Sequence, residues 1–135
     1  PDMVGTHLLF DPNLPHKIFA GADMILIPSR FEPGGIVALE AMRYGSVPIV
    51  RATGGLADSV VDYDPTLGVG TGFSFRTYSG MSFLTAVVRA LETYKNTNVW
   101  NRIVKRAMEQ DFSWDKSAKK YLELYTRAID LKNNS

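Results

Sequence analysis

Two glutamates stand on either side of a proline-glycine-glycine turn in the first third of the chain. Glu32 comes directly before Pro33-Gly34-Gly35, and seven residues separate it from Glu40. The glycines predict a turn whose backbone N–H groups are open to a ligand at the positive end of a helix. Such a turn binds anions, and carboxylates beside it accept hydrogen bonds from hydroxyl groups. The pattern fits a diphosphate that carries a polyol at each end, which is the layout of a nucleotide diphosphate sugar.

The neighbouring sequence places this turn between a strand and a helix. An apolar run predicts a buried parallel strand over Met24 to Pro28, and a helix follows over Ile36 to Tyr44, with Gly45 as its left-handed stop. A second glycine turn, Thr53-Gly54-Gly55, follows the next predicted strand at Val47 to Val50. In parallel sheets ligands bind beyond the carboxyl ends of the strands. We therefore expect the two turns to converge on one crevice.

The rest of the chain alternates between strand and helix and then becomes entirely helical. The apolar strands predict an α/β fold with a Rossmann-like parallel sheet that is covered by helices. The other expected elements are a strand at Thr6 to Phe10, a helix at Pro15 to Ala20 capped by Asn13, a short helix from Gly54 to about Val61, a loop at Asp62 to Gly72, a strand at Gly72 to Phe75, and helices at Met81 to Tyr94, at Val99 to Met108 and from Ser113 onward.

Helical spacing of apolar residues predicts the buried face of each of the last three helices. The tail at 132–135 is expected to fray. The predicted core residues are Phe83, Leu84, Val87, Val88 and Leu91 in the first of these helices, Trp100, Ile103, Val104 and Ala107 in the second, and Trp114, Ala118, Tyr121, Leu122 and Tyr125 in the third.

Composition argues against several functional classes. The chain has 45% hydrophobic and 21% charged residues, a formal net charge of +1 and no cysteine. That charge balance does not favour a nucleic-acid partner, and the lack of cysteine excludes disulfides and thiolate metal sites. No apolar run approaches the roughly 20 residues that span a bilayer. We therefore expect a soluble protein with no nucleic-acid and no membrane partner, and we expect His7 and His16 to be structural or solvated.

The first turn resembles the signature of retaining nucleotide-sugar glycosyltransferases of the two-domain GT-B type, in which seven residues separate two glutamates. Further motifs occur in family order from about Ala20 to Tyr125, and they narrow the resemblance to bacterial glycogen synthase and plant starch synthase. These motifs are Ala22 to Pro33, Ala41 to Val50, Thr53 to Leu56, Thr71 to Phe73 and Gln110 to Trp114.

The resemblance implies a single partial domain over residues 1–135, from the C-terminal nucleotide-sugar-binding domain of a GT-B enzyme whose N-terminal domain is missing. The implied reaction transfers glucose from ADP-glucose or UDP-glucose to the non-reducing end of an α-1,4-glucan with retention of configuration. It implies no metal and no cofactor. The isolated chain is expected to be inactive with its catalytic residues unknown, and the enzyme is expected in the bacterial cytoplasm or a plant plastid.

The resemblance also implies the residues that bind the donor. Glu32 would accept hydrogen bonds from hydroxyls of the donor sugar, and Glu40 from hydroxyls of the ribose. Backbone N–H groups would come from Gly34, Gly35 and Ile36 in the first turn, and hydroxyl and amide groups from Thr53, Gly54 and Gly55 in the second.

Each of these residues has a structural alternative. Glu32 can stabilise the helix N-terminus by roughly 0.3–1 kcal/mol, and Glu40 can lie on a solvated helix face. The glycines can be ordinary turn residues, and Thr53 can be a cap. Arg30 and Arg51 can attract a diphosphate or simply lie on the surface.

Two other functions stay open from the sequence. Gly34 stands where glycogen and starch synthases usually carry cysteine, and Glu40 is more typical of the neighbouring sucrose, trehalose and cell-wall enzymes. Both residues favour another retaining nucleotide-sugar glycosyltransferase. The other alternative is a non-catalytic module that binds a nucleotide or carbohydrate and folds alone.

Overall fold

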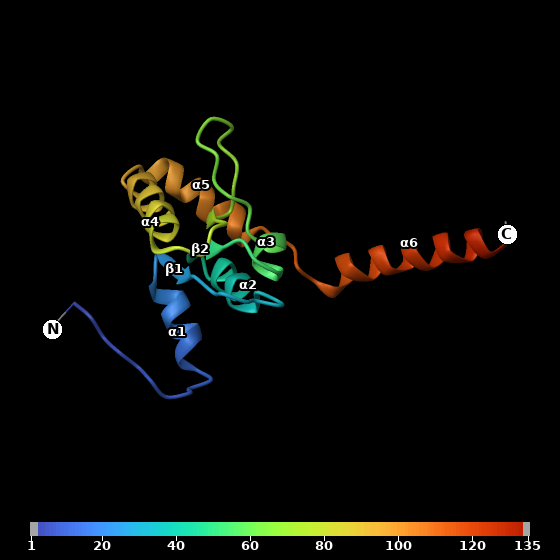
Figure 1. The fold of residues 1–135 in the computed structure, drawn as a ribbon, viewed down its shortest axis with the longest axis horizontal. Coiled ribbons are helices and arrows are strands. Elements are labelled where there is room, and N and C mark those ends of the chain that lie inside the picture. The colour runs from blue at the N-terminus through green and yellow to red at the C-terminus, as the bar shows by residue number, and fades with distance from the viewer. Residues whose placement is uncertain (1–2, 134–135) are drawn as a thin grey trace.

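Three parallel strands form the sheet that carries both glycine turns (Figure 1). Leu26, Ile49 and Phe73 lie side by side across it, so the carboxyl ends of all three strands reach the same edge. The computed structural model describes residues 3–133. The strands, in their spatial order, are β1 (Met24–Ile27), β2 (Val47–Arg51) and β3 (Phe73–Phe75).

Helices cover both faces of the sheet, as the α/β expectation requires, and the core therefore has two parts. On one face, α4 and α5 pack on Ile49 and Phe73. On the other, α2 and α3 pack on Val50. No helix within residues 3–133 is long and apolar enough to cross a membrane. The helices are α1 (Leu14–Gly21), α2 (Ile36–Arg43), α3 (Gly55–Ser59), α4 (Gly80–Tyr94), α5 (Thr97–Met108) and α6 (Trp114–Asn133).

The strand predicted at Thr6 to Phe10 is wrong. This stretch is irregular and exposed, and within residues 3–133 no strand lies beside it to pair with its backbone groups. The predicted Asn13 cap is also wrong, because Asn13 makes no capping hydrogen bond with its side chain. Instead, Asp11 Oδ1 accepts from the amides of Asn13 and Leu14 at 2.8 and 3.3 Å. The remaining elements lie where they were predicted, with boundaries that differ by one or two residues.

The buried face of α4 was predicted only in part. Its closest approach to the sheet is made by Ala86 and Ala90, which are fully buried, with Phe83 and Val87 packed beside them. Because alanine is small, α4 lies close to β2 and β3. The larger residues on the neighbouring face of the helix then point away from the sheet. Three residues predicted to be buried are therefore about half exposed, namely Leu84, Val88 and Leu91. The prediction for α5 holds, since Trp100, Ile103 and Ala107 are buried.

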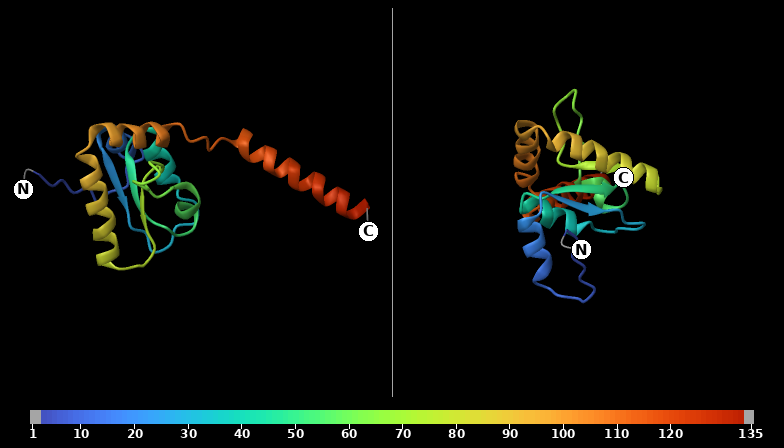
Figure 2. Two further views of the ribbon diagram at one scale, coloured as in Figure 1. Left: turned by 90° about the horizontal axis from the view of Figure 1, so that it is seen from above. Right: turned by 90° about the vertical axis from the view of Figure 1, so that its left-hand side faces the viewer.

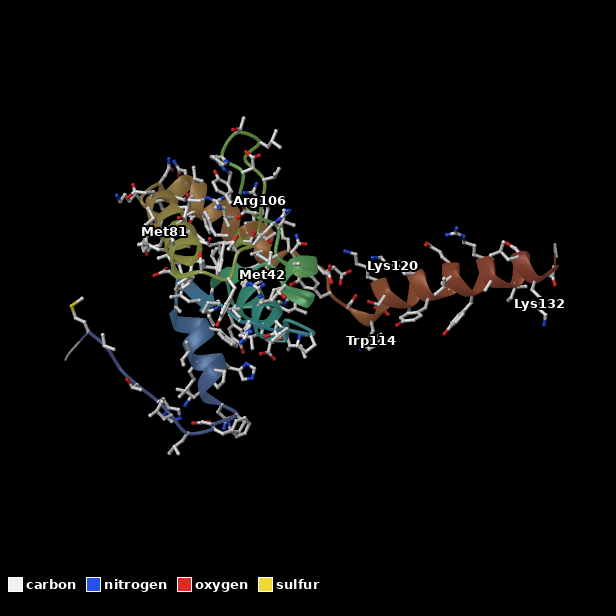
Figure 3. The ribbon with its side chains drawn as sticks, in the orientation of Figure 1. Met42, Met81, Arg106, Trp114, Lys120 and Lys132 are labelled. Atoms are coloured by element: carbon white, nitrogen blue, oxygen red, sulfur yellow. The ribbon has the colours of Figure 1, made fainter. Side chains whose placement is uncertain are left out.

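The prediction that α6 turns its apolar face to the core is wrong. This 20-residue helix extends away from the sheet in Figure 1 and in the left view of Figure 2, and it has no buried residue. Trp114, at its start, is 80% exposed and points into open space (Figure 3). Its apolar residues Tyr121, Leu122 and Tyr125 have helical spacing and are more than half exposed. Of the tail that was expected to fray, Lys132 and Asn133 belong to the helix, and residues 134–135 lie outside the described residues.

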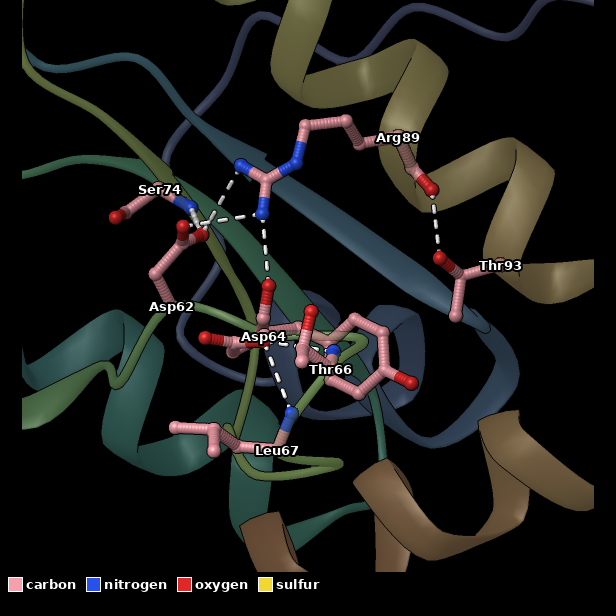
Figure 4. A network of polar contacts seen from close by, with 8 residues as sticks. Asp62, Asp64, Thr66, Leu67, Ser74, Arg89 and Thr93 are labelled. Atoms are coloured by element: carbon pink, nitrogen blue, oxygen red, sulfur yellow. Dashed lines mark hydrogen bonds and ion pairs between the residues drawn. The ribbon is translucent and has the colours of Figure 1, made fainter.

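A polar network joins the long loop before β3 to α4 (Figure 4). Asp62 accepts from the Arg89 guanidinium at 3.0 Å and from the Ser74 amide at 2.6 Å. Arg89 also donates to the carbonyl of Tyr63 at 2.8 Å and lies over the Phe73 ring. The loop is thus attached to both the helix and the last strand, which orders the approach of the chain to β3.

Candidate functional site

The loops that follow the three strands meet at one edge of the sheet, where Arg51 connects them. Its guanidinium donates to the carbonyl of Arg30 at 2.7 Å and to that of Arg76 at 3.2 Å. A further hydrogen bond of 3.4 Å goes to the carbonyl of Ser29. Because its donors are engaged by backbone on both sides, Arg51 has a structural role in ordering this edge.

The two glycine turns are in direct contact, as their shared position at this edge predicts. The amide of Gly55 donates to the carbonyl of Glu32 at 3.1 Å. Gly54 has φ +48°, and a Cβ atom on it would collide with the Glu32 carbonyl oxygen. A Cβ atom on Gly55 would collide with the carbonyl of Gly34. Only glycine permits this approach, so Gly54 and Gly55 allow the second turn to pack directly on the first.

The carboxylate of Glu32 orders the first turn from within. Its Oε1 accepts from the Gly35 amide at 3.1 Å, and its Oε2 lies 3.4 Å from the hydroxyl of Ser29. The side chain is partly buried. A carboxylate offers about four lone-pair sites, so two remain for a ligand after these contacts. The structural alternative for Glu32 is therefore present, and it leaves room for the donor role.

The turn leads into α2 with open amide groups. Gly35 has φ +70° and occupies the cap position of α2, where no side chain accepts from the first turn of the helix. Ile36, the first residue of the helix, and Gly34 are exposed. The first amides of a helix have no acceptor within it, and its N-terminus attracts anions. The amides of Gly34 and Ile36 are thus available to an anion, whereas the Gly35 amide donates to Glu32. Anion binding at this turn stays a prediction.

Glu40 lies away from this turn in a different hollow. It is partly buried on α2 and lines a cavity of about 530 Å³ together with Arg43, the end of α5 and the linker at 109–113. Glu32 does not line this cavity. Glu32 therefore lies beside the second turn, whereas Glu40 lies about one helical turn further along α2. The ribose role of Glu40 stays a prediction.

The remaining candidate site residues are Thr53 in the second turn and the two histidines. Thr53 is partly buried between the ends of β2 and α3, and its amide and carbonyl take part in the turn. His16 contacts the rings of Phe19 and Tyr44, which is the structural role that was expected, and His7 is exposed. Within residues 3–133 no group of three or more histidine, aspartate or glutamate side chains is placed to hold a metal ion.

Sequence reasoning missed two exposed rings at this edge, Phe31 and Tyr78, with the Arg30 guanidinium between them. The guanidinium lies 5.8 Å from the centroid of the first ring and 5.9 Å from that of the second. Phe31 is adjacent to Glu32 in the chain, but Tyr78 follows another strand. Only the pairing of the strands reveals that they are neighbours.

Comparison with known proteins identifies the family. Residues 4–109 match the family model described as glycosyl transferases group 1. The chain belongs to this family. Within it, the chain is 49% identical over 130 residues to a glycogen synthase of Thermotoga petrophila and 50% identical over 131 residues to one of Trichodesmium erythraeum. These matches cover 96% and 97% of the chain, and they confirm the resemblance to glycogen and starch synthases.

Solved structures of glycosyltransferases have the same fold. The catalytic domain of starch synthase IV from Arabidopsis thaliana, bound to ADP and acarbose, superposes with a TM-score of 0.79 at 46% identity over 91% of the chain. A sucrose-phosphate synthase from Thermosynechococcus elongatus gives a TM-score of 0.58 at 25% identity over 84% of the chain.

The chain is much shorter than these relatives. It spans 27% of the Thermotoga glycogen synthase, 28% of the Trichodesmium one and 26% of the starch synthase structure. The comparisons therefore establish the family and the fold of this glycosyltransferase chain. They do not establish its reaction or its ligands.

Proposed function

We propose that the chain forms part of the donor-binding domain of a glucosyltransferase. The full enzyme transfers glucose from ADP-glucose, or from UDP-glucose, to the 4-hydroxyl at the non-reducing end of an α-1,4-glucan, with retention of configuration. The observation that carries this proposal is the contact between the two glycine turns, which places Glu32 beside open amides at the carboxyl edge of a parallel sheet. An anion with adjacent hydroxyls fits that arrangement.

Each part of the site has a chemical task in the proposed reaction. The bond from the anomeric carbon to the diphosphate breaks, a bond from that carbon to the acceptor oxygen forms, and the proton of the acceptor hydroxyl passes to the departing diphosphate oxygen. Amides of Gly34 and Ile36 stabilise the charge that develops on the departing diphosphate, while the Gly35 amide holds the Glu32 carboxylate beside them. Glu32 fixes the donor sugar through its hydroxyls, and positioning supplies much of the rate enhancement.

The relatives support the donor and the acceptor. The starch synthase structure, which is 46% identical to this chain, was determined with ADP and acarbose, a nucleotide and an oligosaccharide-like ligand. The remaining parts of the site, including an N-terminal domain, would come from outside residues 1–135. We therefore propose that the chain alone is inactive. We expect the whole enzyme in the bacterial cytoplasm or a plant plastid.

A second candidate is another retaining glycosyltransferase of the same fold. Gly34 and Glu40 favour it, and the similarity to a sucrose-phosphate synthase is compatible with it. The identity of 25% to that enzyme, against 46% to the starch synthase, makes it the weaker candidate.

Transfer by the full-length protein tests the proposal. We expect labelled glucose to move from ADP-glucose to glycogen, and NMR of the product to show the α-anomer. Calorimetric titration with ADP and UDP then distinguishes the candidates, since tighter binding of UDP would favour the second one. If no sugar nucleotide donated glucose, the glucosyltransferase proposal would be wrong.

A further inference from the structure

A group of exposed aromatic rings lies beside the proposed donor turn. Phe31 is 80% exposed and Tyr78 is 60% exposed, although both belong to loops that Arg51 holds in place. Two large rings exposed side by side on an ordered edge gain free energy when a ligand buries them. Their position suggests a surface that a ligand covers.

A hollow continues from the second ring toward α4. Tyr78, Phe75 and Phe83 line a cavity of about 330 Å³, with Pro28 and the start of α4 completing its wall. The walls are mainly aromatic, and the hydroxyl of Ser79 and backbone groups add a few polar atoms. Pockets of this size and composition bind small organic ligands.

The arginine between the rings keeps its hydrogen-bonding capacity. Among residues 3–133 no acceptor takes a hydrogen bond from the Arg30 guanidinium, which contacts only the faces of the two rings. Arg51 also lies over Tyr78, at 5.4 Å from its centroid, but its donors are occupied by backbone carbonyls. The cluster therefore offers two exposed rings and one guanidinium whose five donors have no acceptor among residues 3–133.

A pyranose ring has the complementary chemistry. It has an apolar face of C–H groups that stacks on an aromatic ring, and hydroxyls at its rim that accept hydrogen bonds from a guanidinium. We propose that Arg30, Phe31 and Tyr78 form a subsite for pyranose units of the acceptor glucan. This inference rests on the proposed function, because the acceptor must reach the donor sugar, and Phe31 directly precedes the residue that is proposed to hold that sugar.

The aromatic residues of α6 are the competing platform. Tyr121 and Tyr125 are exposed on one side of that helix, with ring centroids 6.3 Å apart. They lie on a helix that extends away from the sheet edge (Figure 2), and the shallow hollow beside Tyr121 has Lys120 in place of a fixed arginine. A glucan bound there would not lead to the glycine turns. The sheet edge is thus the better site.

An NMR titration of the 135-residue chain with maltoheptaose tests this inference. We expect amide shifts to concentrate at 30–31 and 76–80, and Tyr78→Ala to raise the dissociation constant roughly fivefold or more by removing one stacking face. Tyr78→Phe, which keeps the ring, should bind like the unaltered chain. Tyr121→Ala is the matched control and should also leave the affinity unchanged. A well-dispersed amide spectrum of each variant confirms that it is folded.

Titration with ADP and UDP separates this inference from the proposed function. The subsite is wrong if maltoheptaose fails to bind, if its shifts lie on α6, or if Tyr78→Ala binds it as tightly as the unaltered chain. Nucleotide binding would then still support the donor site. Absence of nucleotide binding, with maltoheptaose bound at Tyr78, would instead contradict the donor site and leave the carbohydrate subsite standing.

Discussion

At the scale of single residues, Glu32 combines the ordering of a turn with the capacity to bind a ligand. One of its oxygens accepts from the Gly35 amide and the other faces the Ser29 hydroxyl, so the carboxylate is fixed before any ligand arrives. A group held in this way loses little conformational entropy when it binds. The same contacts mean that a substitution can act through the turn or through the ligand, and a test must separate the two effects.

We predict that Glu32→Ala in the full-length enzyme lowers glucosyl transfer by at least roughly tenfold, because a contact to the donor sugar is lost. Glu32→Gln keeps an oxygen for the Gly35 amide, and it should therefore retain the fold while still losing rate. Glu92→Ala, at an exposed ion pair with Lys95, is the control and should leave the rate unchanged. Full activity of Glu32→Ala would remove this carboxylate from the site.

We predict that Gly54→Ala lowers the free energy of unfolding of the chain by roughly 2 kcal/mol or more. The added Cβ would meet the Glu32 carbonyl, and the φ of +48° strains any other residue. Gly80→Ala is the matched control, because nothing lies within 4 Å of a Cβ there and the position begins a helix. It should be neutral or slightly stabilising in urea unfolding. Equal stability of the two variants would mean that the turns are not locked together.

At the scale of elements, the order of the molecule comes from contacts between segments distant in sequence. Arg51 joins the loops after all three strands, and the contact of Asp62 with Arg89 joins the long loop to α4 (Figure 4). The second network lies opposite the proposed site and has a structural role. It keeps β3 in register with β2, and β3 carries Tyr78 on the loop that follows it.

We predict that Asp62→Ala costs about 1 kcal/mol of stability, because the Ser74 amide loses its acceptor and the Arg89 guanidinium loses its ion pair while keeping its hydrogen bond to the Tyr63 carbonyl. The estimate is small because both side chains of the ion pair are more than a third exposed. Glu92→Ala should cost at most about half as much, since its ion pair with Lys95 is more exposed and orders no loop. Urea unfolding of both variants checks this, and a larger loss at Glu92 would contradict it.

We predict a pH effect at the start of α6. Hydrogen bonds from Ser113 hold the pKa of Asp111 below its ordinary value. A lowered pKa means that the carboxylate form is favoured in the folded chain, so its contribution is present above the ordinary pKa and is lost as the pH falls through the lowered one. A carboxyl NMR titration should show the low pKa, and Ser113→Ala should raise it. An unchanged pKa in that variant would contradict the assignment.

The sequence predicted much of this arrangement, for physical reasons that also explain the failures. Apolar runs flanked by glycine identified all three strands, and parallel pairing then required the two glycine turns to meet. The buried face of α4 was predicted wrongly because Ala86 and Ala90 carry little hydrophobic signal, although they approach the sheet most closely. The neighbours Arg30, Phe31 and Tyr78 were not found, because their proximity depends on strand pairing and not on spacing along the chain.

At the scale of the whole molecule, apolar side chains are exposed on several elements of the chain. Leu84, Val88 and Leu91 form an uncovered stripe on α4, and Leu26 at the outer strand β1 is also half exposed. On α6, Tyr121, Leu122 and Tyr125 are more than half exposed. Relatives of which the chain spans only 27% and 26% provide more protein to cover such surfaces. We therefore propose that the glycine turns form one wall of a cleft whose other wall is supplied by the full-length enzyme.

A crystal structure of the full-length enzyme with its sugar nucleotide tests the central claim most directly. We predict that the diphosphate lies against the amides of Gly34 to Ile36 and that the sugar hydroxyls contact Glu32. The same map would show whether Glu40 reaches the ribose. If the donor is bound elsewhere and only water lies against the two glycine turns, the account is wrong.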